Sequence, residues 1–484
     1  MEKSHKGLTA VQLTMMALGT VVGGSFFLGS VVAIQAAGPA VIISYILGGI
    51  LVYFILFAIS EMTVADPGAG SFRTFSEKIY GSGVGFVVGW VYWTGLVLAM
   101  SSEAIAVSIL LKGWVPWLSL PMMGSVLIIL VTVLNMLGAD RLSKLESGLA
   151  AIKLLAIIGF IILGVLLISG IALDVPRIGV GALRGETWFP AGIAGIAGSM
   201  LIVMFTYAGF EIISLAASET SNPHITVPKA IFYTVVSLVG LYLAAIIVLL
   251  PLIPINSFSA EISPMVLALT RWNLGWAGWV MNIVLITAII STMLAAMFGL
   301  GRMIRSLADG GQAPQQLKDK GDIPYRGILF SGVAMLVGLF FGFILPGQVY
   351  IFLVSSGGFA LLFTYLVILL THQKFRKENG CPPKGNCQLP GYPFSSWIAI
   401  ISLVGIILSM PLVPGQGSGL VAGILLTLLY VTAYLIKRYF VKRNVNNEGM
   451  KEGNLRRTAE ILTSQIYAET SEEFLPEELR KKKN

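Results

Sequence analysis

The chain alternates long apolar runs with short polar connections. About twelve of the runs are long enough to cross a bilayer as helices, since a span needs about 20 residues at 1.5 Å each. The predicted spans are residues 13–37, 41–62, 84–111, 121–137, 148–169, 192–217, 226–250, 276–303, 326–345, 348–371, 395–411 and 417–437. Connections of a few residues, such as 37–40, make several consecutive spans antiparallel neighbours. The pattern therefore predicts an all-α polytopic membrane protein.

Composition supports this fold class. Hydrophobic residues make up 56% of the 484 residues and charged residues 12%, with a mean hydropathy of +0.85, which excludes a soluble globule. The apolar runs are continuous rather than alternating ten-residue segments, which excludes a β-barrel. Residues 1–12 are polar and lead straight into a full-length span, so no secretory signal peptide is expected. No nucleotide-binding loop, metalloprotease motif or nucleophile motif indicates an enzyme.

The distribution of Lys and Arg predicts the orientation. If the N-terminus is cytoplasmic, 27 of the 32 Lys and Arg residues fall on the cytoplasmic side and four on the other. This bias predicts cytoplasmic termini in a multi-pass protein of the plasma membrane. Cys381 and Cys387 then lie in a cytoplasmic loop, where thiols are expected to stay reduced. A disulfide there would argue for the opposite orientation, and a metal site is not expected.

Two of the spans contain helix-weakening residues near their centres. The first reads GTVVGGSF over residues 19–26, and the sixth reads FTYAGFE over residues 205–211. Breaks five spans apart indicate two repeats, and because five is odd the second repeat must be inverted. The predicted organisation is a cytoplasmic N-terminus (1–12), a permease domain (13–437) and a cytoplasmic tail (438–484). The domain comprises repeat one (13–169), repeat two (192–371) and two extra helices (395–437).

The two breaks predict a binding site for a zwitterion at the membrane midplane. Free N–H groups at the first break would receive a carboxylate, and carbonyls released at both breaks would receive an ammonium group. Close packing of small residues is the alternative explanation of both breaks. The candidate substrate-binding residues are Val22, Gly23, Gly24, Ser25, Glu103, Phe205, Thr206, Tyr207, Gly209 and Glu211.

Ionisable residues inside spans are costly and therefore indicate function. Lys153 either extends to the membrane surface or is buried and exchanges a proton, in which case it can replace a bound sodium ion. The candidates for proton coupling are Lys153, Glu211 and Glu219. Thr287, Ser291 and Thr292 could line a cation site, although hydroxyls usually bond their own helix. The remaining candidates are gate or loop-fixing charges at Glu61 and at Arg302 with Arg305, and pocket or interface aromatics at Trp90, Tyr92, Trp93 and Tyr365.

Four motifs in order resemble the amino acid permeases of the amino acid–polyamine–organocation superfamily: VVGGSFF, SEMTVADPGAGSF, FTYAGFEIISLAASETSNP and GLGRMIRSLADGGQAP. The resemblance covers residues 12–437 and implies the LeuT-type fold of five plus five inverted spans with two extra C-terminal helices. It implies that Gly23 and Gly24 hold the substrate carboxylate and that residues 205–209 form the substrate pocket and gate. Glu103, Glu211 and Glu219 fall where the lysine permease branch has carboxylates.

The resemblance also implies that Lys153 replaces sodium, as in proton-coupled members. Two positions depart from the family pattern. Ser25 stands where a second glycine is common, and Tyr207 stands where some relatives carry glycine or other residues, so substrate size cannot be carried over.

The expected function is import of an α-amino acid by proton symport and alternating access. No cofactor is expected apart from the coupling ion, H⁺. The expected partners are the amino acid and the lipid bilayer, without nucleic acid, and the oligomeric state stays open. The alternatives are a sodium-coupled or exchange transporter of amino acids or amines, and a transporter-like nutrient sensor. The sequence does not identify the amino acid.

Overall fold

The computed structural model describes residues 8–66, 72–137, 139–171, 177–211, 213, 220, 222–259, 262–319, 321, 323–344, 349–381 and 388–440, without side chains for 139–147 and 341–343. These residues form helices and connections and no β-strand, which confirms the all-α fold class. The main helices are α1 (Ala10–Val21), α2 (Gly24–Phe27), α3 (Gly29–Ala37), α4 (Val41–Ala65), α5 (Phe72–Tyr80), α6 (Ser82–Leu111), α7 (Leu120–Asn135), α8 (Ala139–Ser169), α9 (Gly192–Thr206), α11 (Pro223–Leu252), α12 (Pro264–Arg271), α13 (Gly275–Asp309), α14 (Tyr325–Ile344), α15 (Val349–Asn379) and α16 (Phe394–Ser409). A last helix covers Gln416–Phe440.

The chain divides into two units, residues 1–427 and residues 428–484. The cavity and all residues that line it belong to the first unit. The described part of the second unit, residues 428–440, continues a helix.

Each of the twelve predicted spans contains apolar helix; in the sixth, residues 192–206 are helical, and residues 212 and 214–217 lie outside the described part of the chain. Within the described residues, eight helical segments are long and apolar enough to cross a membrane, and four shorter apolar helices accompany them at 10–21, 120–135, 192–206 and 325–340. The first predicted span comprises α1, α2 and α3, and the sixth begins with α9. The chain is therefore a multi-pass membrane protein.

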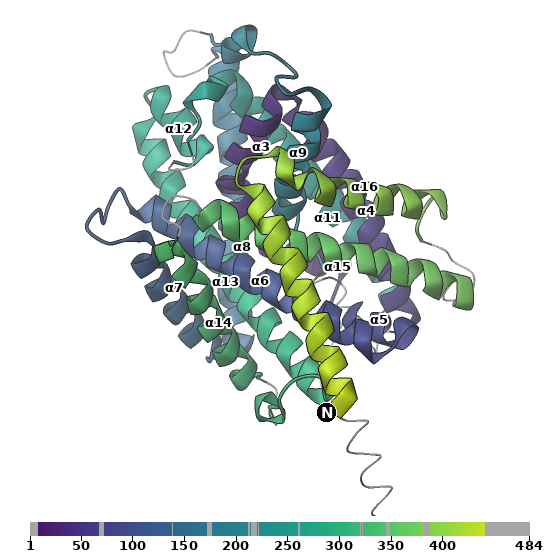
Figure 1. Ribbon diagram of the computed structural model, residues 1–484. Helices are drawn as coiled ribbons and strands as arrows, with labels where there is room; N and C mark the ends of the chain where they lie inside the picture. Colours follow the sequence, from purple (N-terminus) through teal and green to yellow (C-terminus); the bar gives the residue numbers. More distant parts are fainter. Residues whose placement is uncertain are drawn as a thin grey trace, which may run out of the picture. The chain divides into compact units, whose positions relative to one another are not determined.

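The spans pack in two groups. In the first group, which we call the bundle, α4 packs on α11 and α9, α3 on α9, and α1 on α11. In the second, which we call the scaffold, α6, α7, α13 and α14 all contact one another, and α7 and α14 lie side by side near α6 and α13 (Figure 1). The helices α8 and α15 contact both groups.

The packing also pairs the first four spans with their counterparts in the other half. The pairs α3–α9, α4–α11, α6–α13 and α7–α14 join spans that are five apart, and all four pairs are in contact. An inverted repeat predicts these pairs, because a pseudo-twofold axis places equivalent elements opposite each other.

Several helices extend beyond the predicted spans, and two of them do so at charged C-terminal ends. Helix α13 continues from the predicted end at 303 to Asp309, and α15 continues from 371 to Asn379. Hydropathy detects the apolar part of a helix, whereas these extensions carry charged residues that are good helix formers. Both helices end beside a glycine, Gly310 and Gly380.

The short helix α5, in the connection between the second and third spans, was not predicted. Its Arg73 is 4% exposed. The guanidinium donates to Glu77 Oε2 and to Gln312 Oε1, both at 2.8 Å, and to Ser306 Oγ at 3.2 Å. These contacts fix α5 to the end of α13 and the segment after it, and so position the start of α6.

Candidate functional site

The first span is broken where the sequence predicts. Helix α1 ends at Val21, Gly23 is extended (φ −144°, ψ −166°), and α2 begins at Gly24. A Cβ added at Gly24 would lie 2.4 Å from Oε2 of Glu103. A glycine is therefore needed here because a carboxylate from another span approaches the backbone directly.

The sixth span is also broken, and the two breaks touch. Helix α9 ends at Thr206, and residues 207–211 form a turn. Gly209 has φ +106°, a conformation that side-chain-bearing residues rarely adopt. Its carbonyl accepts a hydrogen bond from Thr20 Oγ1 at 3.2 Å. The two predicted interruptions therefore meet around one point inside the protein.

Replacing Gly209 with Ala tests the need for this turn. Besides the positive φ, the new Cβ would lie 3.1 Å from the Thr20 carbonyl oxygen. We expect a loss of about 1–3 kcal/mol of stability, measured as a lower thermal unfolding temperature in detergent, with loss of uptake. Gly240→Ala is the matched control, because no atom lies within 4 Å of a Cβ at that position in α11. Equal unfolding temperatures for the two variants would contradict the proposed strain.

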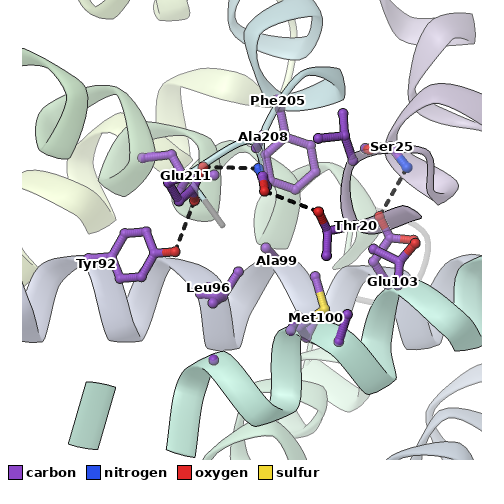
Figure 2. A pocket seen from close by; sticks show the side chains of 17 residues that line it. Thr20, Ser25, Tyr92, Leu96, Ala99, Met100, Glu103, Phe205, Ala208 and Glu211 are labelled. Atoms are coloured by element: carbon purple, nitrogen blue, oxygen red, sulfur yellow. Dashed lines mark hydrogen bonds between the residues drawn. The ribbon is translucent and has the colours of Figure 1, made fainter. Parts of the chain in front are cut away.

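A cavity of about 70 Å³ lies between the breaks and the scaffold (Figure 2). Its polar lining residues are Thr20, Ser25, Tyr92, Glu103, Glu211 and Thr292, and its apolar or small ones are Val21, Leu96, Ala99, Met100, Phe205, Ala208, Gly209, Ala295, Ala296, Gly299 and Leu361. No Lys, Arg or His is among these lining residues. Carboxylates in a largely apolar cavity suit a small ligand that carries an ammonium group.

Glu103 occupies the N–H groups that were expected to be free. Its Oε2 accepts from the Gly24 N–H at 2.8 Å and its Oε1 from the Ser25 N–H at 3.0 Å, and the side chain is 3% exposed. The expectation of unoccupied N–H groups at the first break is thus wrong for Gly24 and Ser25 in this structure. A carboxylate does bind there, but it belongs to the third span.

Lys153 is buried and does not extend to the membrane surface, so the surface alternative is wrong. Its side chain is 0% exposed. The Nζ donates to the carbonyls of Gly19, Val22 (3.1 Å) and Ala288 (3.4 Å), and lies 3.2 Å from Thr292 Oγ1. A cation is therefore held by oxygens at the end of α1 and on α13, which is the arrangement used for coupling ions in broken-helix transporters.

Of the three hydroxyl residues predicted on the eighth span, Thr292 has a contact at this site. Its Oγ1 also donates to the Val22 carbonyl at 3.0 Å. Thr287 bonds its own helix through the Val284 carbonyl. Val22 therefore contributes its carbonyl to Lys153 and Thr292 rather than to the cavity wall.

Glu211 lies at the other end of the cavity from Glu103, as Figure 2 shows, and is 3% exposed. Its Oε1 accepts from the Tyr92 hydroxyl at 2.9 Å. Its Oε2 accepts from the Gly209 N–H at 3.1 Å and from the Tyr365 hydroxyl at 3.4 Å. Two of the four aromatics proposed as pocket or interface residues are thus partners of this carboxylate.

Five predicted substrate-binding residues are not among those that line the cavity: Val22, Gly23, Gly24, Thr206 and Tyr207. The Tyr207 hydroxyl donates to the Tyr45 carbonyl at 3.1 Å, and its ring packs against Tyr45 and Tyr242. Thr206 bonds its own helix through Oγ1 and accepts the Tyr242 hydroxyl at its carbonyl. Gly23 faces Thr292. These residues stabilise the broken helices without lining the cavity.

Sequence reasoning missed other lining residues. Leu96, Ala99 and Met100 follow one face of α6 between Tyr92 and Glu103 (Figure 2). Ala295, Ala296 and Gly299 form the facing wall on α13. Their helical spacing was visible in the sequence, but it is equally typical of ordinary helix packing.

The two predicted gate charges, Glu61 and Arg302, have different surroundings in the structure. Glu61 is 0% exposed and accepts from the Gln388 and Leu389 N–H groups at 2.6 and 2.7 Å, with Arg376 at 3.2 Å and His372 Nε2 at 2.6 Å. It therefore fixes the segment before α16. Arg302 lies over the Phe298 ring on its own helix, 4.8 Å from the centroid. A gating role for either residue stays a prediction.

The sequence also singled out Glu219 for proton coupling and Cys381 as a reduced thiol. Glu219 lies outside the described residues. Cys381 is disulfide-bonded, so the expectation of a reduced thiol is wrong for this residue. Its Sγ also lies 3.3 Å from Arg376 Nη2.

The fold and site define a class: a multi-pass membrane protein with a cavity between two broken helices, which is the architecture of secondary transporters. The chain matches the amino acid permease family model over residues 12–448. It therefore belongs to the amino acid permease family of the amino acid–polyamine–organocation superfamily, a transporter family.

Characterised and uncharacterised relatives agree with this assignment. The chain is 33% identical to an uncharacterized amino acid permease of Bacillus subtilis, YvbW, over 89% of this chain and 96% of that protein. It is 30% identical to the gamma-aminobutyric acid permease of the same organism over 94% and 98%. It is 31% identical to the aromatic amino acid transport protein AroP of Escherichia coli K12 over 86% and 92%.

Proposed function

We propose that this permease imports an α-amino acid across the plasma membrane by proton symport, with both termini in the cytoplasm. The observation that carries the proposal is the position of Lys153. A buried ammonium group is held by the end of α1 and by α13, where a sodium-coupled transporter would hold its ion. Because a lysine can lose and regain a proton when it is buried, this position supports a proton as the coupling ion.

The proposed substrate position is the cavity between the broken helices. The N–H groups of Gly24 and Ser25 are the proposed partners of the substrate carboxylate, once Glu103 no longer occupies them. The Glu211 carboxylate is the proposed partner of an ammonium group. Alternating access then consists of movement of the bundle against the scaffold, because the cavity is bounded by both groups and substrate and proton must each favour one state to be coupled.

Uptake by the purified protein in proteoliposomes tests this function. Labelled L-phenylalanine is the first α-amino acid probe and labelled 4-aminobutyrate, a γ-amino acid, is the contrasting probe, since relatives carry the names of such substrates. The twenty amino acids serve as competitors. In sodium-free buffer, we expect concentrative uptake of at least one probe at an acidic external pH and much less uptake at an alkaline one. An amino acid that competes for the site should reduce this uptake. Sodium-dependent uptake without pH dependence, or exchange alone, would overturn the proton proposal and favour the alternative transporters.

The proposed orientation rests on the distribution of Lys and Arg. The disulfide at Cys381 argues against it, because cytoplasmic thiols stay reduced. Labelling of Lys112→Cys, in the exposed connection after α6, with a membrane-impermeant maleimide on intact cells and on inverted vesicles determines the orientation independently of any substrate.

A further inference from the structure

The connection between α15 and α16 carries the two cysteines of the chain. Cys381 follows the end of α15, is partly exposed and is disulfide-bonded, and the one other cysteine in the sequence is Cys387. Disulfides are rare in cytoplasmic proteins, and those that occur there are usually transient or redox-sensing. The distribution of Lys and Arg predicts that this connection is cytoplasmic. The predicted orientation therefore makes this bond a candidate redox site.

The surroundings of Cys381 favour thiol–disulfide exchange. The Arg376 guanidinium donates to the Cys381 Sγ at 3.3 Å and also to Glu61 Oε1 at 3.2 Å. A positive group beside a sulfur stabilises the thiolate, which is the leaving group when a disulfide is reduced. Reactive cysteines have such electropositive, partly exposed surroundings, whereas buried structural cysteines are inert.

The residues directly after Cys387 are held by one buried carboxylate near the C-terminal end of α4. Glu61 Oε1 accepts from the Gln388 N–H at 2.6 Å and from the Leu389 N–H at 2.7 Å. The Ser60 hydroxyl donates to Gln388 Oε1 at 2.6 Å, and Leu389 is buried. The disulfide therefore restrains the chain at the residue before a segment that is bound to α4.

We propose that Cys381 and Cys387 form a reversible redox-modification site that controls how firmly residues 388–389 are bound to α4. A dithiol reductant attacks the Cys387 sulfur, Cys381 leaves as a thiolate beside Arg376, and the second thiol of the reductant then displaces Cys387. The protein disulfide gains two electrons and two protons and becomes two thiols, while the dithiol becomes a disulfide. A small-molecule disulfide reverses the reaction.

Reduction weakens the binding of this segment in two ways. Opening the bond removes the cross-link that closes residues 381–387 into a loop, so the chain before Gln388 gains conformational freedom. The Cys381 thiolate then competes with Glu61 for the Arg376 guanidinium. The reduced permease is therefore expected to be less stable. Its uptake per folded molecule should be unchanged, because Glu61 is not among the residues that line the cavity.

Hydrogen–deuterium exchange of the purified full-length protein tests the proposal without a substrate. One sample is oxidised with glutathione disulfide and one is reduced with dithiothreitol, and alkylation followed by mass spectrometry counts the free thiols. In the reduced sample we expect about tenfold faster exchange in the peptide that contains Gln388 and Leu389, and a lower unfolding temperature. Unchanged exchange in that peptide after complete reduction would overturn the proposal.

Two controls make the result specific. Peptides of α7 should exchange alike in both samples, because α7 packs on α6, α13 and α14. The double variant with Cys381→Ser and Cys387→Ser should exchange like the reduced parent and respond to neither reagent. A response of the double variant would show that the reagents act elsewhere and would contradict the proposal.

Arg376 is a positioning residue in this proposal. Arg376→Gln is expected to slow the reduction by dithiothreitol about tenfold, because the leaving thiolate loses its neighbouring cation. Arg376→Lys keeps the charge and should restore most of the rate. Lys374→Gln is the matched control on the same helix, since the Lys374 Nζ donates to the Ile79 carbonyl at 3.0 Å. Reduction of all three variants at the rate of the parent would contradict the role of Arg376.

Alkylation in intact cells distinguishes a redox site from a structural disulfide. With the permeant reagent N-ethylmaleimide, we expect both thiols to be alkylated in untreated cells and to be protected after treatment with the permeant oxidant diamide. Protection in untreated cells, with reduction only by an impermeant reductant added outside, would overturn the redox site and the proposed orientation together. None of these measurements depends on amino acid uptake, so the transport function is tested separately.

Discussion

Replacing Lys153 with Ala is expected to abolish concentrative, proton-driven uptake. The substitution removes the ammonium group from the carbonyls of Gly19, Val22 and Ala288, and the protein then has no group at this position that can bind and release a proton. Uptake in proteoliposomes with an inward proton gradient should fall to the level of protein-free liposomes.

Lys153→Arg distinguishes a need for proton exchange at this position from a need for a positive charge alone. Arginine keeps a positive charge at the site but does not release its proton, because a guanidinium group stays protonated in proteins. It should therefore fail in proton-driven uptake as Lys153→Ala does, although the fold keeps its cation. Full activity of the Arg variant would show that the charge is needed only for structure.

Lys112→Ala is the matched control for both variants. Lys112 is exposed, and its Nζ donates to the carbonyls of Pro116 and Leu118 in the connection after α6. Its loss should leave uptake and its pH dependence unchanged. An unaltered proton dependence in Lys153→Ala would remove this residue from the coupling mechanism.

Replacing Glu211 with Gln should impair transport far more than replacing Glu61 with Gln. Two donors now face the Glu211 carboxylate, the Tyr92 hydroxyl and the Gly209 N–H. The glutamine side chain places an NH₂ group, which cannot accept a hydrogen bond, opposite one of them. One hydrogen bond to a charged group, about 1.5–3 kcal/mol, is lost in the middle of the site. We expect a reduction of uptake of about tenfold or more per folded molecule.

Glu61→Gln should act on stability instead. Its carboxylate faces Arg376 and two backbone N–H groups away from the cavity, and breaking a buried ion pair costs about 3–5 kcal/mol. A lower unfolding temperature with near-normal uptake per folded molecule is expected. Equal losses of uptake in the two variants would argue against placing Glu211 at the substrate site.

The sequence was sufficient for the features that depend on local chemistry. Glycines at 23, 24 and 209 weaken a helix wherever they occur, so both breaks could be located, and an ionisable residue in an apolar run such as Lys153 is conspicuous. Apolar runs also located every span. These signals need no knowledge of which helices touch.

Other features depend on contacts between distant residues. Glu103 could be recognised as costly, but its place on the Gly24 and Ser25 N–H groups requires the third span to cross the first. Glu61 was assigned to a gate because its partners, including Leu389, lie more than 300 positions later. Helix ends beyond the membrane were missed because polar helix and polar loop have similar hydropathy.

The side chain of Tyr207 illustrates the same limit. Its position in the unwound segment was predicted, but whether the ring faces the cavity depends on the space left by Tyr45 and Tyr242. Packing of three aromatic rings turned it away from the site.

The most direct test of the whole account is simultaneous measurement of substrate and proton movement in one proteoliposome preparation. A trapped pH-sensitive dye reports the internal pH while labelled amino acid is counted, in sodium-free buffer without an imposed gradient. We expect that adding substrate outside acidifies the interior in the wild type and does not in Lys153→Arg. Substrate entry without acidification, or entry that begins only when sodium is added, would contradict it.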